Sequence, residues 1–371
     1  MARPVEGLIL KLLVQPRDGV GPLLAGIKSA KKSIDILIFR MDFNDIEAAL
    51  IAASGKGIAV RALIAHTNRG GEPKLRSMEM RFLEAGITVG RTAADLTRYH
   101  GKMMIVDRRL LFLLSFNFVH LDIDHSRGFG VIAKNAKVVG EAVKLFEADL
   151  NRQTYEAGLG TFIVSPTNAR KELAAFLKQA RKQLLIYDPD LADKQMIRIL
   201  EDQAKAGIEV KVIGNMLAPS SNIAVAALTN IRLHTRTIIR DGRQAFIGSQ
   251  SLRESELDER REIGMMVRTS TIVGELLATF EKDWASTGFD EARRDAAKPL
   301  EKEPPKITAK ANRALAKEMA PLKTKLKKAI KKAVESAGKD AQMHGALKLT
   351  VKAAVKIAVN QAVQELAEEV Q

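Results

Sequence analysis

Two histidines, each followed two residues later by a basic side chain, are the strongest chemical feature of this sequence. His100 precedes Lys102, and His234 precedes Arg236. On a β-strand, residues i and i+2 face the same side, so each pair would project an imidazole and a cation together. One neutral imidazole can attack phosphorus and a protonated one can give its proton to the leaving oxygen, while the cations bind the non-bridging oxygens. If the two pairs meet in one cleft, they predict a phosphodiester site.

This chemistry requires neither a metal ion nor an organic cofactor, and we expect none. The chain has no cysteine, which excludes disulfide scaffolds, thiolate metal sites and cysteine nucleophiles. Acidic and cysteine partners for a histidine metal site are also missing at ligand spacing. The other histidines (His66, His120, His125 and His344) are predicted to be structural, with a position at the rim of the cleft as the less favoured alternative for His120 and His125.

An internal repeat would bring the two basic pairs together. Eight identical residue pairs recur at one offset of 134, which indicates a duplicated unit where a single match would be weak. The pairs are His100/His234, Asp107/Asp241, Ser115/Ser249, Arg127/Arg261, Gly130/Gly264, Phe146/Phe280, Glu147/Glu281 and Asp149/Asp283. Upstream blocks match at an offset of 150, so the first unit carries about 16 extra residues. We expect them as a loop within residues 70–96, because Gly70, Gly71 and Pro73 punctuate that stretch.

The hydrophobic pattern of each repeat unit predicts alternating strands and helices. In the first unit we expect strands at residues 34–39, 60–65, 103–106, 110–114 and 129–132, and helices at 45–53 and 141–150. In the second we expect strands at 184–187, 210–213, 237–239, 245–247 and 264–267, and a helix at 275–284. Such alternation gives a sheet with helices on its faces, and a tight turn after residue 106 makes part of it antiparallel. The predicted fold class is α/β, with two pseudo-symmetric mixed-sheet lobes at residues 1–155 and 156–290.

The composition changes after Gly288. Prolines mark a linker, and amphipathic stripes rich in Ala and Lys predict a basic α-helical C-terminal tail over residues 291–371. Between residues 302 and 332 there are 11 Lys or Arg against two Glu, a net +9 of the chain's +15. We expect the tail helices to dock on the body or to form an oligomer. The alternative is that the run from Lys323 to Lys332 binds an anionic membrane surface or nucleic acid, although the scarcity of aromatics disfavours base stacking.

The location of the protein is predicted from the absence of targeting signals. No apolar run approaches the roughly 18 residues needed to cross a bilayer. The first residues also lack the layout of a secretory signal. We therefore expect a cytoplasmic protein, with peripheral membrane attachment as the alternative.

The spacing of the repeated motif resembles the phospholipase D superfamily in its two-copy form, over residues 8–290. The matching residues are His100, Lys102, Asp107, Ser115 and Asn117 in the first copy, and His234, Arg236, Asp241, Ser249 and Ser251 in the second. The resemblance implies that the first-copy histidine forms a phosphohistidine and the second acts as general acid and base. It also implies a structural role for the two aspartates, and a phosphate-binding or supporting role for the serines and Asn117.

The sequence departs from the family pattern at several positions. Arg236 stands where the family has lysine, Ser251 replaces asparagine, and Leu114 replaces glycine. The resemblance also implies an orienting carboxylate 28 residues after each histidine. Glu262 fills that position for His234, whereas Gly128 stands there for His100, leaving Asp122 or Asp124 as candidates.

The resemblance implies a phosphodiesterase that cleaves or transfers a phospholipid head group. Two alternatives stay open: a metal-independent endonuclease of the same superfamily, or a phosphate-binding scaffold with weakened catalysis. Members that synthesise cardiolipin commonly carry membrane spans, and none is visible in this sequence. The motif leaves undecided whether the substrate is lipid or nucleic acid, whether the reaction is hydrolysis or transfer, and which histidine is the nucleophile.

Overall fold

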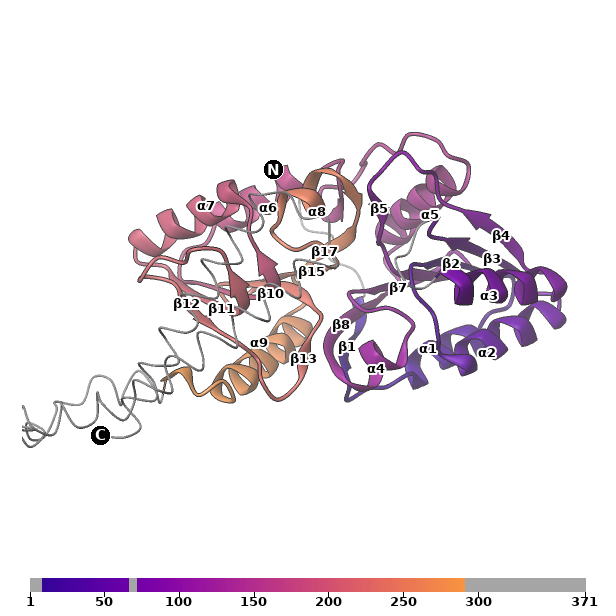
Figure 1. Cartoon of the computed structure of the whole chain (residues 1–371), viewed down its shortest axis with the longest axis horizontal. Helices are drawn as coiled ribbons and strands as arrows, with labels where there is room; N and C mark the ends of the chain where they lie inside the picture. Colours follow the sequence, from indigo (N-terminus) through magenta and orange to yellow (C-terminus); the bar gives the residue numbers. More distant parts are fainter. Residues whose placement is uncertain (1–8, 67–71, 291–371) are drawn as a thin grey trace, which may run out of the picture. The chain divides into compact units, whose positions relative to one another are not determined.

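The computed structural model describes residues 9–66 and 72–290, and the structural statements below refer to those ranges. The predicted linker and helical tail lie outside them, as do His344 and the run from Lys323 to Lys332. Figure 1 shows the described residues as two α/β lobes, the first in indigo to purple and the second in pink to orange.

The first lobe is built on a mixed sheet with the strand order β1-β8-β7-β6-β2-β3-β4. Its strands are β1 (Ile9–Gln15), β2 (Ser33–Ile38), β3 (Ala59–Ile64), β4 (Thr88–Arg91), β6 (Met103–Val106), β7 (Leu110–Leu114) and β8 (Ser126–Ala133). β2, β3 and β4 run parallel, whereas β6, β7, β8 and β1 pair antiparallel. The predicted strands of this lobe are all present.

The second lobe repeats this arrangement in the order β12-β11-β10-β14-β15-β17-β9. Its strands are β9 (Phe162–Val164), β10 (Gln183–Leu191), β11 (Glu209–Met216), β12 (Ala224–Ala226), β14 (Arg236–Arg240), β15 (Gln244–Gly248) and β17 (Ile263–Val267). Again one half of the sheet is parallel and the other antiparallel. The mixed-sheet α/β fold predicted from the repeat is confirmed.

Helices pack on both faces of each sheet. The helices are α1 (Gly21–Lys28), α2 (Asn44–Gly55), α3 (Glu72–Glu84), α4 (His120–Asp124), α5 (Ala136–Leu150), α6 (Ala169–Lys178), α7 (Lys194–Lys205), α8 (Glu254–Asp258) and α9 (Ser270–Ala285). One apolar cluster joins α1, α2 and α3 to the first sheet, and another joins α6 and α7 to the second. Within the described part of the chain, no helix has the length and apolar character needed to span a bilayer.

The 16-residue insertion in the first unit is a helix and not the predicted loop. α3 occupies it, and β4 follows as a further parallel strand. Leu75, Met78 and Phe82 recur at helical spacing and are buried against the first lobe, which explains why this segment folds as a helix.

Asp107 and Asp241 hold equivalent hairpin turns in the two lobes. The carboxylate of Asp107 accepts hydrogen bonds from the backbone N–H groups of residues 31–33, and that of Asp241 accepts them from residues 181–183. Both residues have a positive φ, of 51° and 55°, which Asp tolerates better than most side chains. Each lies at the far end of a strand from the nearby histidine, so neither reaches the imidazoles.

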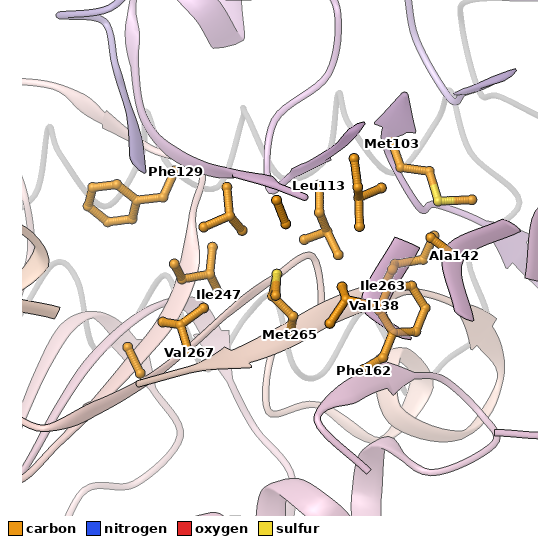
Figure 2. Close-up of a cluster of buried hydrophobic side chains, with 14 of the residues drawn as sticks. Met103, Leu113, Phe129, Val138, Ala142, Phe162, Ile247, Ile263, Met265 and Val267 are labelled. Atoms are coloured by element: carbon orange, nitrogen blue, oxygen red, sulfur yellow. The ribbon is translucent and has the colours of Figure 1, made fainter. Parts of the chain in front are cut away.

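The two lobes share one hydrophobic core. A single cluster of buried side chains contains residues from both sheets together with α5 and α9. Figure 2 shows Leu113 and Phe129 of the first lobe facing Ile247 and Met265 of the second. Each Å² of apolar surface buried in this cluster contributes about 25 cal/mol to the stability of the fold. The shared cluster therefore favours one joined body over two separate lobes.

Short strands and ion pairs are exchanged between the lobes in a pseudo-symmetric way. β13 (Arg232–Leu233) of the second lobe pairs with β8 of the first, and β5 (Arg98–Tyr99) of the first pairs with β16 (Arg260–Arg261) of the second. Arg127 then binds Asp283 on α9 at 2.7 Å, while Arg261 binds Asp149 on α5 at 3.1 Å. The repeated Arg and Asp of the sequence are therefore cross-lobe partners.

Breaking one of these exchanged pairs should destabilise the protein strongly. Asp283 is buried, and it also accepts a hydrogen bond from the Tyr187 hydroxyl at 2.7 Å. We expect Arg127→Met to lower the free energy of unfolding by about 3–5 kcal/mol, because it leaves a buried carboxylate without its cation. Denaturant titration with fluorescence detection measures this.

The matched control for that variant is Arg253→Met. Arg253 pairs with Asp190, and both side chains are half exposed to solvent. An exposed pair of this kind contributes at most about 1 kcal/mol. Equal losses in the two variants would contradict the role assigned to the exchanged pair.

Candidate active site

The backbone of each motif histidine is anchored to the opposite lobe. The N–H of His100, directly after β5, donates to the carbonyl oxygen of Arg261 at 2.7 Å. The N–H of His234, directly after β13, donates to the carbonyl oxygen of Arg127 at 3.1 Å. The residues that bridge the lobes by their guanidinium groups thus also position the two histidines.

His100 is held by a buried carboxylate. Its Nδ1 lies 2.9 Å from both carboxylate oxygens of Glu262, a side chain with 0% exposure. A carboxylate can only accept, so Nδ1 carries the proton and Nε2 presents its lone pair on the opposite side of the ring. Burial raises the pKa of Glu262, against the lowering effect of Lys102 and of a hydrogen bond from Ser249.

The expected pairing of Glu262 with His234 is wrong. Glu262 directly follows β16, and the parallel pairing of β16 with β5 places it beside His100 of the other lobe. Gly101 permits the close approach of the two chains, because a Cβ at this position would lie 2.4 Å from the Ile263 side chain. The glycine at position 128 therefore does not leave His100 without a carboxylate.

The partner of His234 is Asp122 of the first lobe. Its Oδ2 lies 3.4 Å from His234 Nδ1, longer than a normal hydrogen bond. The same oxygen accepts from the backbone and side-chain nitrogens of Asn117, at 2.9 and 2.7 Å. Burial works to raise the pKa of Asp122, but His234, the Asn117 bonds and Arg232 outweigh it and hold that pKa below its ordinary value. The suggestion that Asp122 or Asp124 serves His100 is therefore wrong, since Asp122 faces His234 and Asp124 binds His120.

The two predicted cations differ in how they are held. Arg236 Nε donates to the Ser251 hydroxyl at 3.1 Å, and Nη1 donates to the carbonyl oxygen of His234 at 3.0 Å. Lys102 has 0% exposure, and its Nζ has no hydrogen-bond partner among the described residues. Burial lowers the pKa of Lys102 to about 7. An ammonium buried in this way is ready to bind an anion.

The histidines and cations share one electrostatic environment. Burial lowers the pKa of both His100 and His234 well below the ordinary value, and in each case Lys102 and Arg236 lower it further. Glu262 of the second lobe and Asp122 of the first both act on Lys102. The structure thus brings the two predicted pairs into one site, where the charges of Lys102 and Arg236 act on both imidazoles.

The supporting residues act on the site through other groups. Ser115 accepts from the Phe129 N–H, and Ser249 accepts from the Ile263 N–H, so both tie adjacent strands together. Asn117 holds Asp122, and Ser251 holds Arg236. All four side chains are buried.

The structure shows the surroundings of His120 and His125, the two histidines considered for the rim of the site. His120 is exposed, with Nδ1 2.8 Å from Asp124 Oδ2 and its ring stacked on Phe43. His125 lines a hollow beside Arg232. In the part of the chain that the structure describes, no three His, Asp or Glu side chains are grouped as a metal site.

The family of the chain is decided by a match over residues 23–150 and 173–284, more than half of its length, to the family described as cardiolipin synthase, PLD-like domain. The chain belongs to the phospholipase D-like family. No curated protein matches it. The two matched segments each contain one of the motif histidines, so both phospholipase D-like units predicted from the repeat are present.

Solved structures share the phospholipase D-like fold of this chain. Polyphosphate kinase from Porphyromonas gingivalis has a TM-score of 0.62 and 21% identity, over 74% of this chain and 50% of that chain. Phosphatidylserine synthase from Haemophilus influenzae has a TM-score of 0.56 and 10% identity, over 74% of this chain and 85% of that chain. Identities this low show the fold alone, and the chain spans only half the length of the polyphosphate kinase.

Sequence reasoning did not place three residues that surround this phospholipase D-like site. The Phe39 ring packs edge-on against His100 at 4.5 Å between centroids, with Lys102 5.4 Å from its centre. Arg98 lies 5.5 Å from the same ring centre. Arg98 and Arg232 stand two residues before the two histidines, at the repeat offset of 134. That coincidence is the sequence signal that could have identified both arginines.

Replacing Lys102 should stabilise the protein while weakening anion binding. The folded pKa of about 7 lies below the ordinary 10.5, so the unfolded chain binds more protons between these values and stability rises with pH there. We expect Lys102→Met to raise Tm by at least roughly 3 °C at pH 7 and by less at pH 9.5. We also expect tungstate, a phosphate analogue, to bind at least ~10-fold more weakly because its cation is lost. Calorimetry measures both.

Lys171→Met serves as the control for this variant. The Lys171 side chain is 87% exposed, so its removal should change neither Tm nor tungstate binding. A drop in Tm for Lys102→Met at both pH values would contradict the assignment of Lys102 as an unpaired buried cation.

Proposed function

We propose that this phospholipase D-like chain is a phosphodiesterase that cleaves or transfers a phospholipid head group through a phosphohistidine. One observation carries the proposal. Lys102 is fully buried without a hydrogen-bond partner among the described residues, beside two imidazoles that are each backed by a carboxylate of the opposite lobe. A phosphodiester supplies an anion to Lys102 and to Arg236, which also lies 3.9 Å from Glu256, and the imidazoles supply the nucleophile and the acid.

In the first step we assign the nucleophile to His100. Glu262 holds the proton on Nδ1, so Nε2 is free to attack phosphorus. The N–P bond forms while the bond from phosphorus to the head-group oxygen breaks, and His234 gives its proton to that oxygen. The anionic phosphate raises the proton affinity of His234 when it binds, which offsets the effect of burial.

In the second step His234 acts as the base. It takes a proton from water or from an acceptor alcohol, whose oxygen attacks phosphorus as the N–P bond to His100 breaks. Water gives hydrolysis and an alcohol gives transfer. Lys102 and Arg236 neutralise the charge that builds up on the non-bridging oxygens in both steps.

The description of the matched family as a cardiolipin synthase domain supports a phospholipid substrate. The endonuclease and the phosphate-binding scaffold predicted as alternatives are outcomes of the tests below. Binding of a membrane surface or of nucleic acid by the run from Lys323 to Lys332, and oligomer formation through the tail helices, stay predictions.

Single substitutions of the two histidines should separate their roles. We expect His100→Ala and His234→Ala each to lower turnover of a phospholipid at least ~10³-fold, because each removes a covalent or proton-transfer role. An alkyl p-nitrophenyl phosphodiester needs no acid for its leaving group. His234→Ala should therefore still release one equivalent of nitrophenol and accumulate a phosphorylated His100, detected by mass spectrometry.

The same trapping experiment discriminates between the three functions. Brief exposure of the wild-type chain to phospholipid vesicles or to plasmid DNA, in the presence of chelator, should leave the adduct from the lipid. An adduct from DNA alone would establish the endonuclease. Tungstate binding without any adduct would establish the scaffold, and an adduct on His234 would reverse the assignment of the nucleophile.

The carboxylate beside His100 should matter more for the chemical step than the aspartate of the turn. Glu262→Gln removes the charge that holds the Nδ1 proton, so kcat should fall at least ~10²-fold. Asp107→Asn alters only a turn at the far end of the strand, and in folded protein it should change kcat less than ~10-fold. Single-turnover kinetics compare the two variants, and the reverse order would overturn the role of Glu262.

A further inference from the structure

Arg232 lies beside the Asp122–His234 pair and binds the carboxylate oxygen of Asp122 that does not face His234. Its Nη1 donates to Asp122 Oδ1 at 2.8 Å and to the Ser126 hydroxyl at 2.9 Å. The other carboxylate oxygen of Asp122 faces His234. The three side chains therefore form a relay in the order arginine, carboxylate, imidazole, which crosses between the lobes twice.

We propose that Arg232 is a positioning residue that orients Asp122 beside His234. It also partly offsets the negative charge of Asp122, so that His234 can both give and take the proton. The catalytic consequence of this inference rests on the proposed function, whereas the contacts among the three side chains do not depend on it. The Asp122 carboxylate favours the imidazolium form of His234, which can give a proton, whereas Arg232 favours the neutral form, which can take one. Arg232 opposes that carboxylate directly.

Among the residues that the structure describes, no arginine is hydrogen-bonded to Glu262 as Arg232 is to Asp122, which makes the two halves of the site unequal. Arg98 is the repeat counterpart of Arg232, yet it lies over the Phe39 ring. Glu262 is bound by both oxygens to His100. His100 is thus held in one tautomer, as a nucleophile requires, whereas the carboxylate behind His234 is shared with a cation. This inequality agrees with the roles assigned to the two histidines.

The charges that face His234 come from several elements. Asp122 on α4 favours the imidazolium, whereas Arg236 on β14, Lys102 before β6 and Arg232 on β13 disfavour it. Asn117 is neutral and binds only Asp122. Of the three cations, Arg236 and Lys102 flank the phosphate site, so Arg232 is the one whose removal changes His234 without removing a phosphate ligand.

Arg232 is accessible from a hollow of about 460 Å³ that Asp124, His125 and residues 228–231 also line. Its side chain is 43% exposed, whereas Asp122 is buried. Truncation of Arg232 would extend this hollow to Asp122. A small cation from solution could then reach the carboxylate, which offers a test by chemical rescue.

The first test measures the proton affinity of His234 directly and needs no substrate. In the full chain with labelled histidine, NMR titration follows the imidazoles, and His234→Gln assigns the signal. We expect Arg232→Met to raise the pKa of His234 by roughly 0.5–1 unit, since a nearby cation is lost. Arg232→Lys, which keeps the charge, should shift it less. No shift in a folded Arg232→Met protein would overturn the proposal.

The second test follows activity. If His234 is the acid, the basic limb of the kcat/KM profile should move to higher pH in Arg232→Met, while the acidic limb set by His100 stays in place. We expect kcat to fall by up to about 10-fold, because a pKa rise of at most about one unit lowers the neutral fraction of His234 by no more than that factor. Arg17→Met is the control, since Arg17 is a half-exposed arginine paired with Asp18 and Glu275. A movement of both limbs would show a general structural effect and refute the relay.

Chemical rescue distinguishes the loss of the Arg232 cation from a general loss of protein stability. Arg232→Ala should regain at least ~5-fold activity in tens of millimolar guanidinium chloride, whereas wild type and Arg17→Met should not gain. The NMR shift without activity on any phosphodiester would leave the relay standing and remove the proposed function. Full activity in all variants, with no shift in the pKa of His234, would refute the relay and leave the proposed function standing.

Discussion

The structure depends on the exchange of short strands between two like lobes. β5 and β13 carry the segments that lead into His100 and His234, and each pairs with the opposite lobe. One arginine in each receiving strand then accepts a backbone hydrogen bond from the histidine and binds an aspartate on the far helix. Because these contacts are shared, the geometry of the site cannot change without moving the interface between the lobes.

This constraint explains why so many charged groups can be buried near one site. Arg127, Asp283, Arg261 and Asp149 are removed from solvent and paired, so their charges are compensated. Lys102 differs from them, since its Nζ has no hydrogen-bond partner in the described residues. A chain that leaves a buried ammonium without a hydrogen-bond partner loses stability at that position. Such a loss is typical of a site that must bind a charged ligand.

The two halves of the site are related by sequence but are not equivalent. Glu262 binds His100 through both oxygens, whereas Asp122 divides its oxygens among Asn117, Arg232 and His234. One imidazole is therefore held in a single tautomer, whereas the other shares its carboxylate with a neutral amide and a cation. A duplicated unit that began as symmetric can divide a nucleophile and an acid between its copies by changes of this kind, without altering the fold.

The amino-acid sequence by itself determined the duplicated unit, the mixed α/β lobes, and the residues that meet in the site, because spacing and hydrophobic pattern are properties of each segment alone. It did not reveal α3, whose flanking glycines and proline resemble a loop until burial of Leu75, Met78 and Phe82 is taken into account. Only the tertiary structure decided which carboxylate serves which histidine. Glu262 and Asp122 each lie in the lobe opposite to their histidine, and pairing across exchanged strands depends on contacts between residues far apart in the chain, which local spacing does not encode.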